Sequence, residues 1–272
     1  MTDRNIFNLT GKTVLVTGGS RGIGRAYAEA VAAFGANVAI AARDQGKIDE
    51  TLGILAGYNV ETLGISADMT VEEDVQRMVD ETVRKFGSID VLFNNAGIAR
   101  PRRMIHEEVV ADFDTVISTN LRAPFLVLKY VLAVMVNQNK GSVINTSSTA
   151  SLRAEVPEVA PVAYSAAKAG INVMTQVAAV QYAEYNIRVN CIVPGGTRTE
   201  LGHDMPRPET PPDPQMVAAM QELFKKNLED VPMRRGGEPD EFAGLAVLLA
   251  SDASSFITGQ IITQDGGRSA KH

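Results

Sequence analysis

Tyr164 and Lys168, four positions apart, form the pair in this sequence that is best suited to proton transfer. Residues at this spacing lie on one face of a helix, so the ammonium group can reach the phenol. A tyrosine in water has a pKa near ~10 and exchanges its proton poorly at neutral pH. A neighbouring positive charge lowers that pKa, which lets the phenol donate a proton to a carbonyl or accept one from an alcohol. Taken alone, the same spacing also fits a solvated helix face.

A glycine-rich segment, TGGSRGIG at residues 17–24, is suited to binding a phosphate. Gly18, Gly22 and Gly24 permit positive φ angles and a close approach of the backbone to a ligand. The segment lies between an apolar run and an amphipathic stretch, so it would open a helix. The free N–H groups and positive dipole end of such a helix attract a pyrophosphate. The alternative is a turn that needs glycine for packing alone.

The apolar pattern around these residues indicates strands that alternate with helices. The expected strands are residues 13–17, 38–42, 62–67, 89–93, 142–146, 188–193 and 261–263. The expected helices include 23–34, 48–55, 71–86, 163–185 and 240–249, and Thr70 with Glu73 forms a capping box before the third. Continuous apolar strands separated by helices are typical of a parallel sheet covered on both faces. We therefore expect residues 1–272 to form a single α/β domain of the Rossmann-type, doubly wound class.

Six motifs, taken in their order along the chain, resemble those of the short-chain dehydrogenase/reductase family. They are the glycine turn, Asn94-Asn95-Ala96-Gly97, Ser147-Ser148, Tyr164-Ser165-Ala166-Ala167-Lys168, Pro194-Gly195 and Asp265-Gly266-Gly267. The resemblance extends over about residues 9–267. It implies a nicotinamide cofactor and a hydride transfer between that cofactor and a carbonyl or alcohol carbon.

The resemblance implies a catalytic set of Asn120, Ser148, Tyr164 and Lys168. Ser148, the second serine of its pair, would bind the substrate oxygen at the end of a strand. Asn120 would support a water chain that leads to the lysine. Pro124 has no N–H to offer the carbonyl of residue 120, so the helix should kink there. A buried asparagine that satisfies its own helix is the other interpretation of Asn120.

The expected cofactor is NADP(H) rather than NAD(H). Where an NAD-binding protein places an acidic residue against the ribose 2′-hydroxyl, this chain has Ala42 followed by Arg43. Arg43 and Arg21 suit a 2′-phosphate, although Arg43 also fits an ordinary surface position. The expected cofactor contacts, besides Tyr164 and Lys168, are Gly18, Ser20, Arg21, Gly22, Ile23, Gly24, Arg43, Asp68, Asn94, Asn95, Gly97, Pro194, Gly195, Thr197 and Thr199.

Composition and charge exclude several classes of protein. With 26 basic and 32 acidic residues the chain carries −6, so it has no basic excess for binding nucleic-acid phosphates. A single cysteine and three histidines exclude an internal disulfide and disfavour a metal site. The N-terminus lacks an apolar signal segment, and the apolar run 125–136 is too short to span a membrane. We expect a cytoplasmic protein with no membrane or nucleic-acid partner, and the family resemblance implies a homotetramer or homodimer.

Residues 200–236 interrupt the regular pattern. They contain five prolines followed by a methionine-bearing helical stretch at 215–228. An excursion of this length predicts a substrate lid with an apolar inner face, although a subunit contact or fixed core packing would need the same residues. The interval from Ser148 to Tyr164 is also slightly longer than is usual in the family, and its extra residues fall at 153–162.

These features favour an NADP(H)-dependent ketone reductase or secondary alcohol dehydrogenase that uses a tyrosine as general acid and base. An NAD-linked sugar or polyol dehydrogenase is the first alternative. A cofactor-binding regulatory protein without turnover is the second. The motifs do not identify the small-molecule substrate.

Overall fold

The computed structural model describes residues 5–101, 103–152, 161–199, 201 and 229–271, which form a seven-stranded sheet covered by helices. Neighbouring strands pair in parallel, in the order β3-β2-β1-β4-β5-β6-β7. The strands are β1 (Thr13–Thr17), β2 (Asn37–Ala42), β3 (Thr62–Ser66), β4 (Val91–Asn94), β5 (Gly141–Thr146), β6 (Ile187–Pro194) and β7 (Ile261–Gln264). The predicted doubly wound α/β fold is therefore confirmed.

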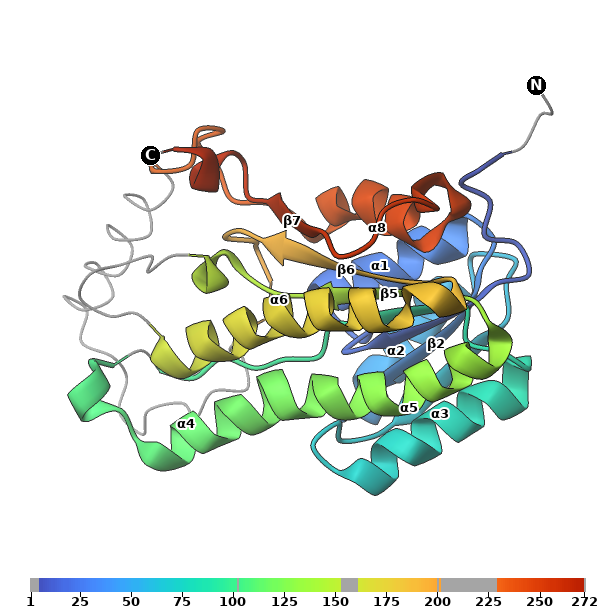
Figure 1. Cartoon of the computed structure of the whole chain (residues 1–272), viewed down its shortest axis with the longest axis horizontal. Coiled ribbons are helices and arrows are strands. Elements are labelled where there is room, and N and C mark those ends of the chain that lie inside the picture. Colours follow the sequence, from blue (N-terminus) through green and yellow to red (C-terminus); the bar gives the residue numbers. More distant parts are fainter. Residues whose placement is uncertain (1–4, 102, 153–160, 200, 202–228, 272) are drawn as a thin grey trace.

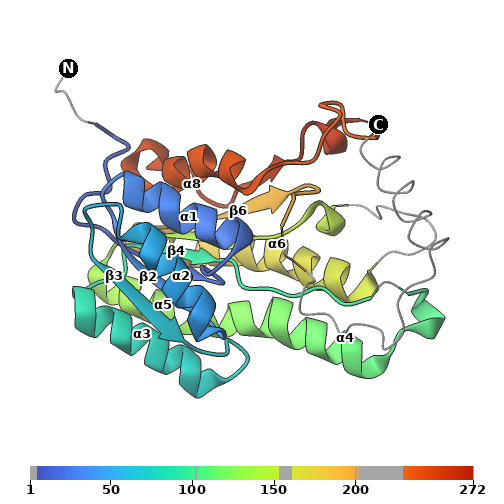
Figure 2. The same ribbon diagram turned by 180° about the vertical axis from the view of Figure 1, so that it is seen from behind.

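Helices lie on both faces of the sheet (Figures 1 and 2). One face is covered by α1 (Gly22–Ala33), α2 (Gln45–Leu55) and α8 (Ala243–Ala250). The other is covered by α3 (Glu72–Phe86), α5 (Ala123–Gln138) and α6 (Val162–Tyr182). Short α4 (Val110–Ile117) continues into α5 through a π-helical turn, η2 (Ser118–Arg122). Single-turn helices η1 (Ile105–Glu107), η3 (Thr149–Ser151), η4 (Ala183–Tyr185), η5 (Pro239–Phe242), η6 (Asp252–Ser254) and η7 (Arg268–Ala270) complete the described elements.

The strands are buried because both of their faces meet a helical layer. Along β1, Leu15 packs into the core beneath α3 and α5, whereas Val14 and Val16 pack beneath α1 and α8. Tyr27 of α1 stacks on Phe93 of β4 with ring centres 4.6 Å apart. Burying a large apolar side chain contributes roughly 1.5–3 kcal/mol, which explains why continuous apolar runs predict the strands of such a sheet.

The order of the strands fixes where a ligand can bind. Strand β1 lies between β2 and β4. Strands β2 and β3 extend the sheet on one side of β1, and strands β4 to β7 extend it on the other. The helices that follow β1 and β4 therefore diverge onto opposite faces. The crevice outside the carboxyl ends of these two strands is the usual ligand position in such sheets.

The predicted capping box at Thr70 is wrong. Helix α3 begins at Glu72 with Val71 as its N-cap, and no side chain caps it. The hydroxyl and N–H of Thr70 instead bind Asp68 Oδ1, at 2.7 and 2.8 Å. Asp68 thus takes the Thr70 N–H that a capping box would direct to Glu73, and the helix starts later than the sequence pattern indicates. Val71 is consequently exposed rather than part of the apolar stripe.

Helix boundaries elsewhere agree with the predictions to within a few residues. The helix expected at 240–249 starts as η5, with Pro239 in its first turn, and a capping box is formed there by Glu238 and Glu241. Most of 200–236, including the helical stretch 215–228, and residues 153–160 lie outside the described residues. Of the apolar residues expected to line the lid, Met233 is described and is exposed.

Among the described residues, one helical run is long and apolar enough to cross a membrane by length and composition alone. It comprises residues 110–138, and half of its most apolar window is buried inside the fold. A core helix of a globular protein has the same composition, because its inward faces meet the sheet and neighbouring helices.

Candidate active site

A cavity of about 1240 Å³ lies at the carboxyl edge of the sheet. The glycine turn after β1 and the ends of β2, β4, β5 and β6 contribute to its wall, together with the start of α6. The cavity brings together residues that are up to 183 positions apart in sequence, from Gly18 to Leu201. Every predicted site residue except Asn94 and Asn120 lines it.

The glycine turn takes the conformation that its residues permit. Gly18 and Gly22 have φ angles of +64° and +54°, in the left-handed region. A Cβ on Gly24 would collide with the Gly18 carbonyl, so this position requires glycine for close packing of helix on strand. Helix α1 then begins at Gly22 with neither a side-chain cap nor an acidic residue in its first turn. The first residues of α1 line the cavity, so its positive dipole end and free N–H groups are available to a diphosphate.

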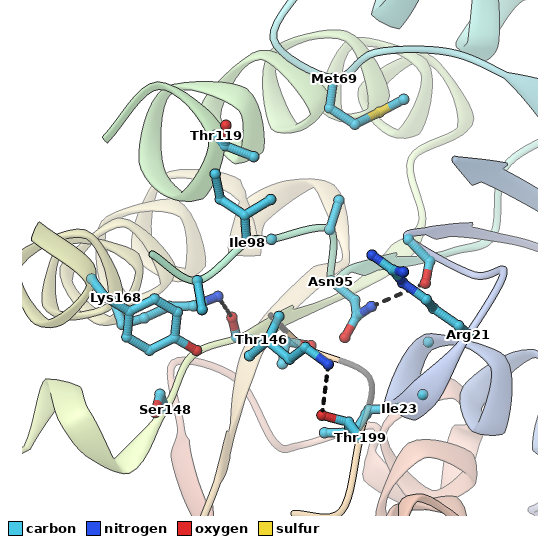
Figure 3. A pocket seen from close by; sticks show the side chains of 18 of the residues that line it. Arg21, Ile23, Met69, Asn95, Ile98, Thr119, Thr146, Ser148, Lys168 and Thr199 are labelled. Carbon is cyan, nitrogen blue, oxygen red and sulfur yellow. Dashed lines mark hydrogen bonds between the residues drawn. The ribbon is translucent and has the colours of Figure 1, made fainter. Parts of the chain in front are cut away.

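Lys168 and Tyr164 share one face of α6, as their spacing predicts. The Lys168 ammonium lies 5.6 Å from the centre of the Tyr164 ring and donates a 2.8 Å hydrogen bond to the Thr146 carbonyl (Figure 3). Lys168 is only 4% exposed. Burial lowers the pKa of Lys168 from 10.5 to about 8, because the charged form loses its hydration. A lysine with this pKa can exchange a proton close to neutral pH.

The two serines after β5 have different surroundings. Ser147 is 2% exposed, and its hydroxyl donates a 2.9 Å hydrogen bond to the Lys168 backbone carbonyl. Ser148 is half-buried and lines the cavity (Figure 3), and its Oγ accepts from the Ala150 N–H at 3.2 Å. The Ser148 hydroxyl hydrogen therefore remains available for an oxygen inside the cavity. This difference supports the choice of Ser148 over its neighbour as the substrate-binding serine.

Asn120 lies in the π-helical turn η2 and is fully buried. Its Oδ1 accepts from the Ile98 N–H and its Nδ2 donates to the Ile98 carbonyl, both at 2.8 Å. The side chain thus binds another segment rather than its own helix, and it fixes the backbone that follows β4. A Cβ on Gly97 would lie 3.1 Å from Asn120 Oδ1 and 3.7 Å from Lys168 Nζ, so glycine allows these groups to approach. The expected kink at Pro124 takes the form of the π turn.

Asn94 does not line the cavity, although the sequence predicts a cofactor contact at this residue. Its side chain is buried and donates to the Pro124 carbonyl at 3.0 Å and to Asn145 Oδ1 at 3.1 Å. These two hydrogen bonds hold the Asn94 side chain against α5 and β5. Asn95 lines the cavity and donates through Nδ2 to the Thr17 carbonyl at 3.2 Å, which joins the ends of β4 and β1.

A basic group lies in the part of the cavity beyond β2. Arg21, Arg43 and Lys47 line the wall there, and the sequence analysis did not identify Lys47. Asp44 also lines it, but its carboxylate accepts from the Lys47 backbone N–H at 3.1 Å and caps α2. The start of α2 therefore compensates the charge of Asp44, and the Lys47 ammonium forms an ion pair with Glu50 at 2.9 Å. This arrangement suits an additional phosphate group.

The remaining predicted contacts border the same cavity. Asp68 follows β3 and is anchored by Thr70, and Pro194 ends β6. The Thr197 hydroxyl donates to the Gly195 carbonyl at 3.0 Å. Thr199 faces the glycine turn, because a Cβ on Gly22 would lie 3.5 Å from the Thr199 side chain. The segment after β6 thus closes over the start of α1.

Several lining residues carried no recognisable motif in the sequence. They follow the end of β4, line the α4–η2 helix or follow Ser148: Ile98, Ala99, Arg100, Asp114, Thr115, Ser118, Thr119, Thr149 and Ala150. The residues that follow β4 and Ser148 could have been found from the motifs beside them, whereas those of α4 and η2 carry no such signal except that Ser118 and Thr119 precede Asn120. Within the described residues, no group of three or more His, Cys, Asp or Glu side chains could hold a metal ion.

The chain is similar in sequence and structure to known dehydrogenases and reductases. A family model described as enoyl-(acyl carrier protein) reductase matches residues 18–269. Glucose 1-dehydrogenase 2 of Bacillus subtilis is 36% identical over 262 residues, 96% of this chain and 95% of the relative. The crystal structure of a levodione reductase has a TM-score of 0.87 at 33% identity and covers 97% of this chain and 100% of its own. That of an NAD⁺-bound xylitol dehydrogenase has a TM-score of 0.84 at 34% identity, over 95% and 99%.

Proposed function

The chain belongs to the short-chain dehydrogenase/reductase family of nicotinamide-dependent oxidoreductases, and we propose that it transfers a hydride between NADP(H) and a carbonyl or secondary alcohol. One observation carries the proposal. The Tyr164–Lys168 pair and the Ser148 hydroxyl line the same cavity as a glycine turn that leads into a helix N-terminus. A binding protein would need the glycine turn but would have no use for the proton-transfer groups.

The roles of the side chains follow from their positions. When bound, the nicotinamide ring supplies or accepts the hydride. Ser148 donates a hydrogen bond to the substrate oxygen and Tyr164 transfers its proton to or from that oxygen. Lys168, held by the Thr146 carbonyl, favours the phenolate form of Tyr164 and can return a proton to it. Asn120 keeps the backbone at Gly97 and Ile98 in place beside the lysine, and a water chain at Asn120 remains part of the proposal.

The cofactor is proposed to bind along the predicted contacts, with its diphosphate at the glycine turn. Arg21 and Arg43 support NADP(H), together with Lys47, which also forms an ion pair with Glu50, because cations in this part of the cavity favour a 2′-phosphate. The structural relative xylitol dehydrogenase is described as NAD⁺-bound, so an NAD-linked polyol dehydrogenase is the alternative to test.

An assay of cofactor oxidation with a panel of ketones and keto-sugars tests the reaction. We expect turnover of at least one carbonyl compound, with a kcat/KM for NADPH above that for NADH. Absence of turnover with every carbonyl and alcohol tested, despite NADPH binding, would favour a regulatory protein. A preference of the wild type for NADH would overturn the cofactor assignment.

The double substitution Ala42→Asp with Arg43→Gln sharpens the cofactor test. A carboxylate at this position would repel a 2′-phosphate and accept from a 2′-hydroxyl, so the preference should shift toward NADH. Arg84→Gln, an exposed arginine on α3, is the matched control and should leave the ratio unchanged.

A homo-oligomer in the cytoplasm completes the proposal. Val173, Val177 and Val180 are 59%, 49% and 82% exposed along one stripe of α6, and Phe125 of α5 is 53% exposed. Apolar side chains at this helical spacing support a contact between subunits. Light scattering should give a mass of two or four chains, and Val180→Asp should lower it. A monomeric wild type would contradict this part of the proposal.

A further inference from the structure

A row of polar side chains lies directly behind Ser148 and is not explained by ligand binding. Ser151 closes the single-turn helix η3 and contacts the Ser148 carbonyl twice. Its backbone N–H donates at 2.9 Å and its hydroxyl at 2.6 Å. Asn172, two turns after Tyr164 on α6, donates through Nδ2 to the Ser151 Oγ at 2.9 Å. The backbone that carries Ser148 is therefore tied to the helix that carries Tyr164 and Lys168.

The direction of each hydrogen bond in this row is determined by its chemistry. A carbonyl oxygen can only accept, so the Ser151 hydroxyl must give its one hydrogen to Ser148. Ser151 Oγ can then only accept, which means that Asn172 presents its NH₂ group to it and turns Oδ1 away. Cys191 Sγ lies 3.7 Å from that Oδ1 and 3.5 Å from the Ile192 carbonyl. Burial raises the pKa of the Cys191 thiol to about 12, so the thiol retains the proton that it can share with Asn172.

A second tie joins the same two segments. Ser147 donates to the Lys168 carbonyl at 2.9 Å, one turn of α6 before Asn172. The Ser147 and Ser151 hydroxyl oxygens are 3.2 Å apart, and both hydrogens are already committed to carbonyl groups. The two ties hold the end of β5 and η3 against α6 at two successive turns. The hydroxyl of Ser148 has no such tie and faces the cavity (Figure 3).

We propose that Ser151 and Asn172 are positioning residues that set the Ser148 hydroxyl at a fixed distance from the Tyr164 phenol. This inference rests on the proposed function of the site. Both reacting side chains must meet one substrate oxygen, but Ser148 belongs to the segment between β5 and η3 and Tyr164 belongs to α6. Displacement of a reacting group by about 1 Å can cost on the order of a hundredfold in rate. The hydrogen bonds from Asn172 to Ser151 and from Ser151 to the Ser148 carbonyl form a clamp. This clamp fixes the position of Ser148 relative to α6, the helix that also carries Tyr164.

The test uses Ser151→Ala and Asn172→Leu in the full-length enzyme. Each should lower kcat about tenfold, because the Ser151 backbone N–H still holds the Ser148 carbonyl in both variants. The dissociation constant for NADPH should stay within about twofold of wild type. Ser151→Thr, which retains a hydroxyl, should recover most of the rate. Asn172→Asp, whose carboxylate cannot donate, should resemble Asn172→Leu.

A double-mutant cycle separates positioning from general destabilisation. In a Ser148→Ala background no hydroxyl remains to be positioned, so adding Ser151→Ala should lower kcat no further. Ser142→Ala is the matched control, since its buried hydroxyl donates to the Leu249 carbonyl at the opposite end of β5. It should leave kcat unchanged.

The outcomes distinguish this inference from the proposed function. If the wild type turns over carbonyl substrates and Ser148→Ala is impaired, yet Ser151→Ala and Asn172→Leu match the wild type, the clamp is wrong and the function stands. Equal effects of Ser151→Ala with and without Ser148 would also overturn it, because the loss would then not act through Ser148. Absence of any wild-type turnover would refute the function itself.

Discussion

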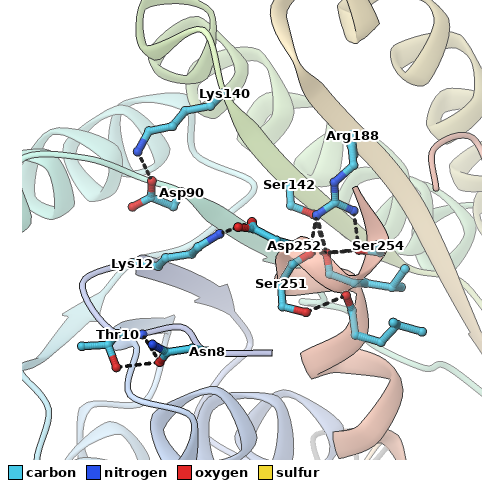
Figure 4. A network of polar contacts seen from close by, with 12 residues as sticks. Asn8, Thr10, Lys12, Asp90, Lys140, Ser142, Arg188, Ser251, Asp252 and Ser254 are labelled. Atoms are coloured by element: carbon cyan, nitrogen blue, oxygen red, sulfur yellow. Dashed lines mark hydrogen bonds and ion pairs between the residues drawn. The ribbon is translucent and has the colours of Figure 1, made fainter. Parts of the chain in front are cut away.

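Buried charged groups have different partners at the two ends of the strands, here called the amino edge and the carboxyl edge of the sheet. At the amino edge, Asp90 receives hydrogen bonds from the Thr13 N–H at 3.0 Å and from Ser88 Oγ at 2.9 Å. It also receives one from Lys140 Nζ at 2.8 Å (Figure 4). Burial by itself would raise the pKa of Asp90, but these donors hold it below its ordinary value of 3.8. At the carboxyl edge, the ammonium of Lys168 meets a carbonyl oxygen and, in the described part of the chain, no carboxylate within ion-pair distance.

Arg188 extends the contrast at the amino edge. Its guanidinium donates to Ser254 Oγ at 2.7 Å and to the Leu249 and Ser251 carbonyls at 2.9 and 3.2 Å (Figure 4). Burial lowers its pKa, yet arginine remains charged at any physiological pH. These carbonyls lie at the end of α8, where the helix dipole favours a cation. A buried charge at this edge is therefore matched by surrounding acceptors.

The difference indicates that the charged groups at the amino edge stabilise the fold, whereas Lys168 at the carboxyl edge lowers its stability. A buried lysine without a carboxylate partner is costly to keep charged, but its lowered pKa suits the proton transfer that we propose. Each of the following changes tests one side of this comparison, beginning with the largest expected effect.

Tyr164→Phe should lower kcat by about 10²–10⁴-fold, the usual contribution of general acid–base catalysis. Binding of NADPH should change little, because the phenol is one of many lining groups. Stopped-flow turnover and fluorescence titration of NADPH measure the two quantities. Tyr130→Phe, which removes a hydroxyl that donates to Glu72 at 2.9 Å, is the control. Retention of more than about a tenth of the wild-type kcat would contradict the role of Tyr164.

Lys168→Met should reduce activity strongly while raising stability at pH 7. The pKa of Lys168 is about 8 in the folded protein and 10.5 in the unfolded chain. Below pH 8 the folded protein therefore carries a buried ammonium group, which lowers the free energy of unfolding. The shift corresponds to about 3 kcal/mol, part of which is offset by the lost bond to Thr146.

The pH dependence of this gain follows from the same shift. Wild-type stability rises between pH 8 and 10.5 as folding releases the proton, so the advantage of the variant should shrink over that range. Urea unfolding at pH 7 and pH 10 measures it, with the exposed Lys129→Met as control. A variant less stable than wild type at pH 7 would show that Lys168 is compensated after all.

Arg188→Met should show the opposite pattern. Loss of three hydrogen bonds from a charged donor should lower the free energy of unfolding by about 2–4 kcal/mol, because the α8 carbonyls lose their partner. Turnover measured well below the melting temperature should remain near the wild-type value. An equal loss in Arg84→Met, or a large loss of kcat in Arg188→Met, would break the comparison between the two edges.

Asp90→Asn should have the smallest effect, a loss of about 1–2 kcal/mol at pH 7. The folded pKa of Asp90 is depressed, so its contribution is fully present above pH 4 and disappears as the pH falls through the folded value. In urea unfolding, the difference in stability between variant and wild type should therefore shrink as the pH falls below 4. A difference that does not shrink below pH 4, down to the acid unfolding of the wild type, would mean that the carboxylate charge contributes nothing.

Local pattern was sufficient to predict the elements and much of the site. Runs such as residues 13–17 are apolar because both faces of their strands are buried, and the structure confirms them as strands. The glycines at 18, 22 and 24 are required by backbone geometry within seven residues. Tyr164 and Lys168 meet because the helix repeat alone places residues four apart on one face.

Hydrogen bonds between residues that are distant in sequence depend on the tertiary structure, and the sequence pattern did not predict them. The choice between Ser147 and Ser148 depends on the Lys168 carbonyl, 21 positions away, which occupies the first hydroxyl. Asn94 turns to Asn145 instead of a ligand because β4 and β5 are neighbours in the sheet. Asn120 binds Ile98 because helix η2 passes beside the end of β4.

The amino-acid sequence by itself thus determined the class of fold, the glycine turn and the pairing of Tyr164 with Lys168, since each depends on interactions within one turn or one strand. The tertiary structure decided which serine hydroxyl donates to the Lys168 carbonyl, which asparagine is buried away from the cavity and how far the pKa of Lys168 falls. These properties depend on the order of the strands and on which groups exclude water. Neither is encoded in the spacing of residues along the chain.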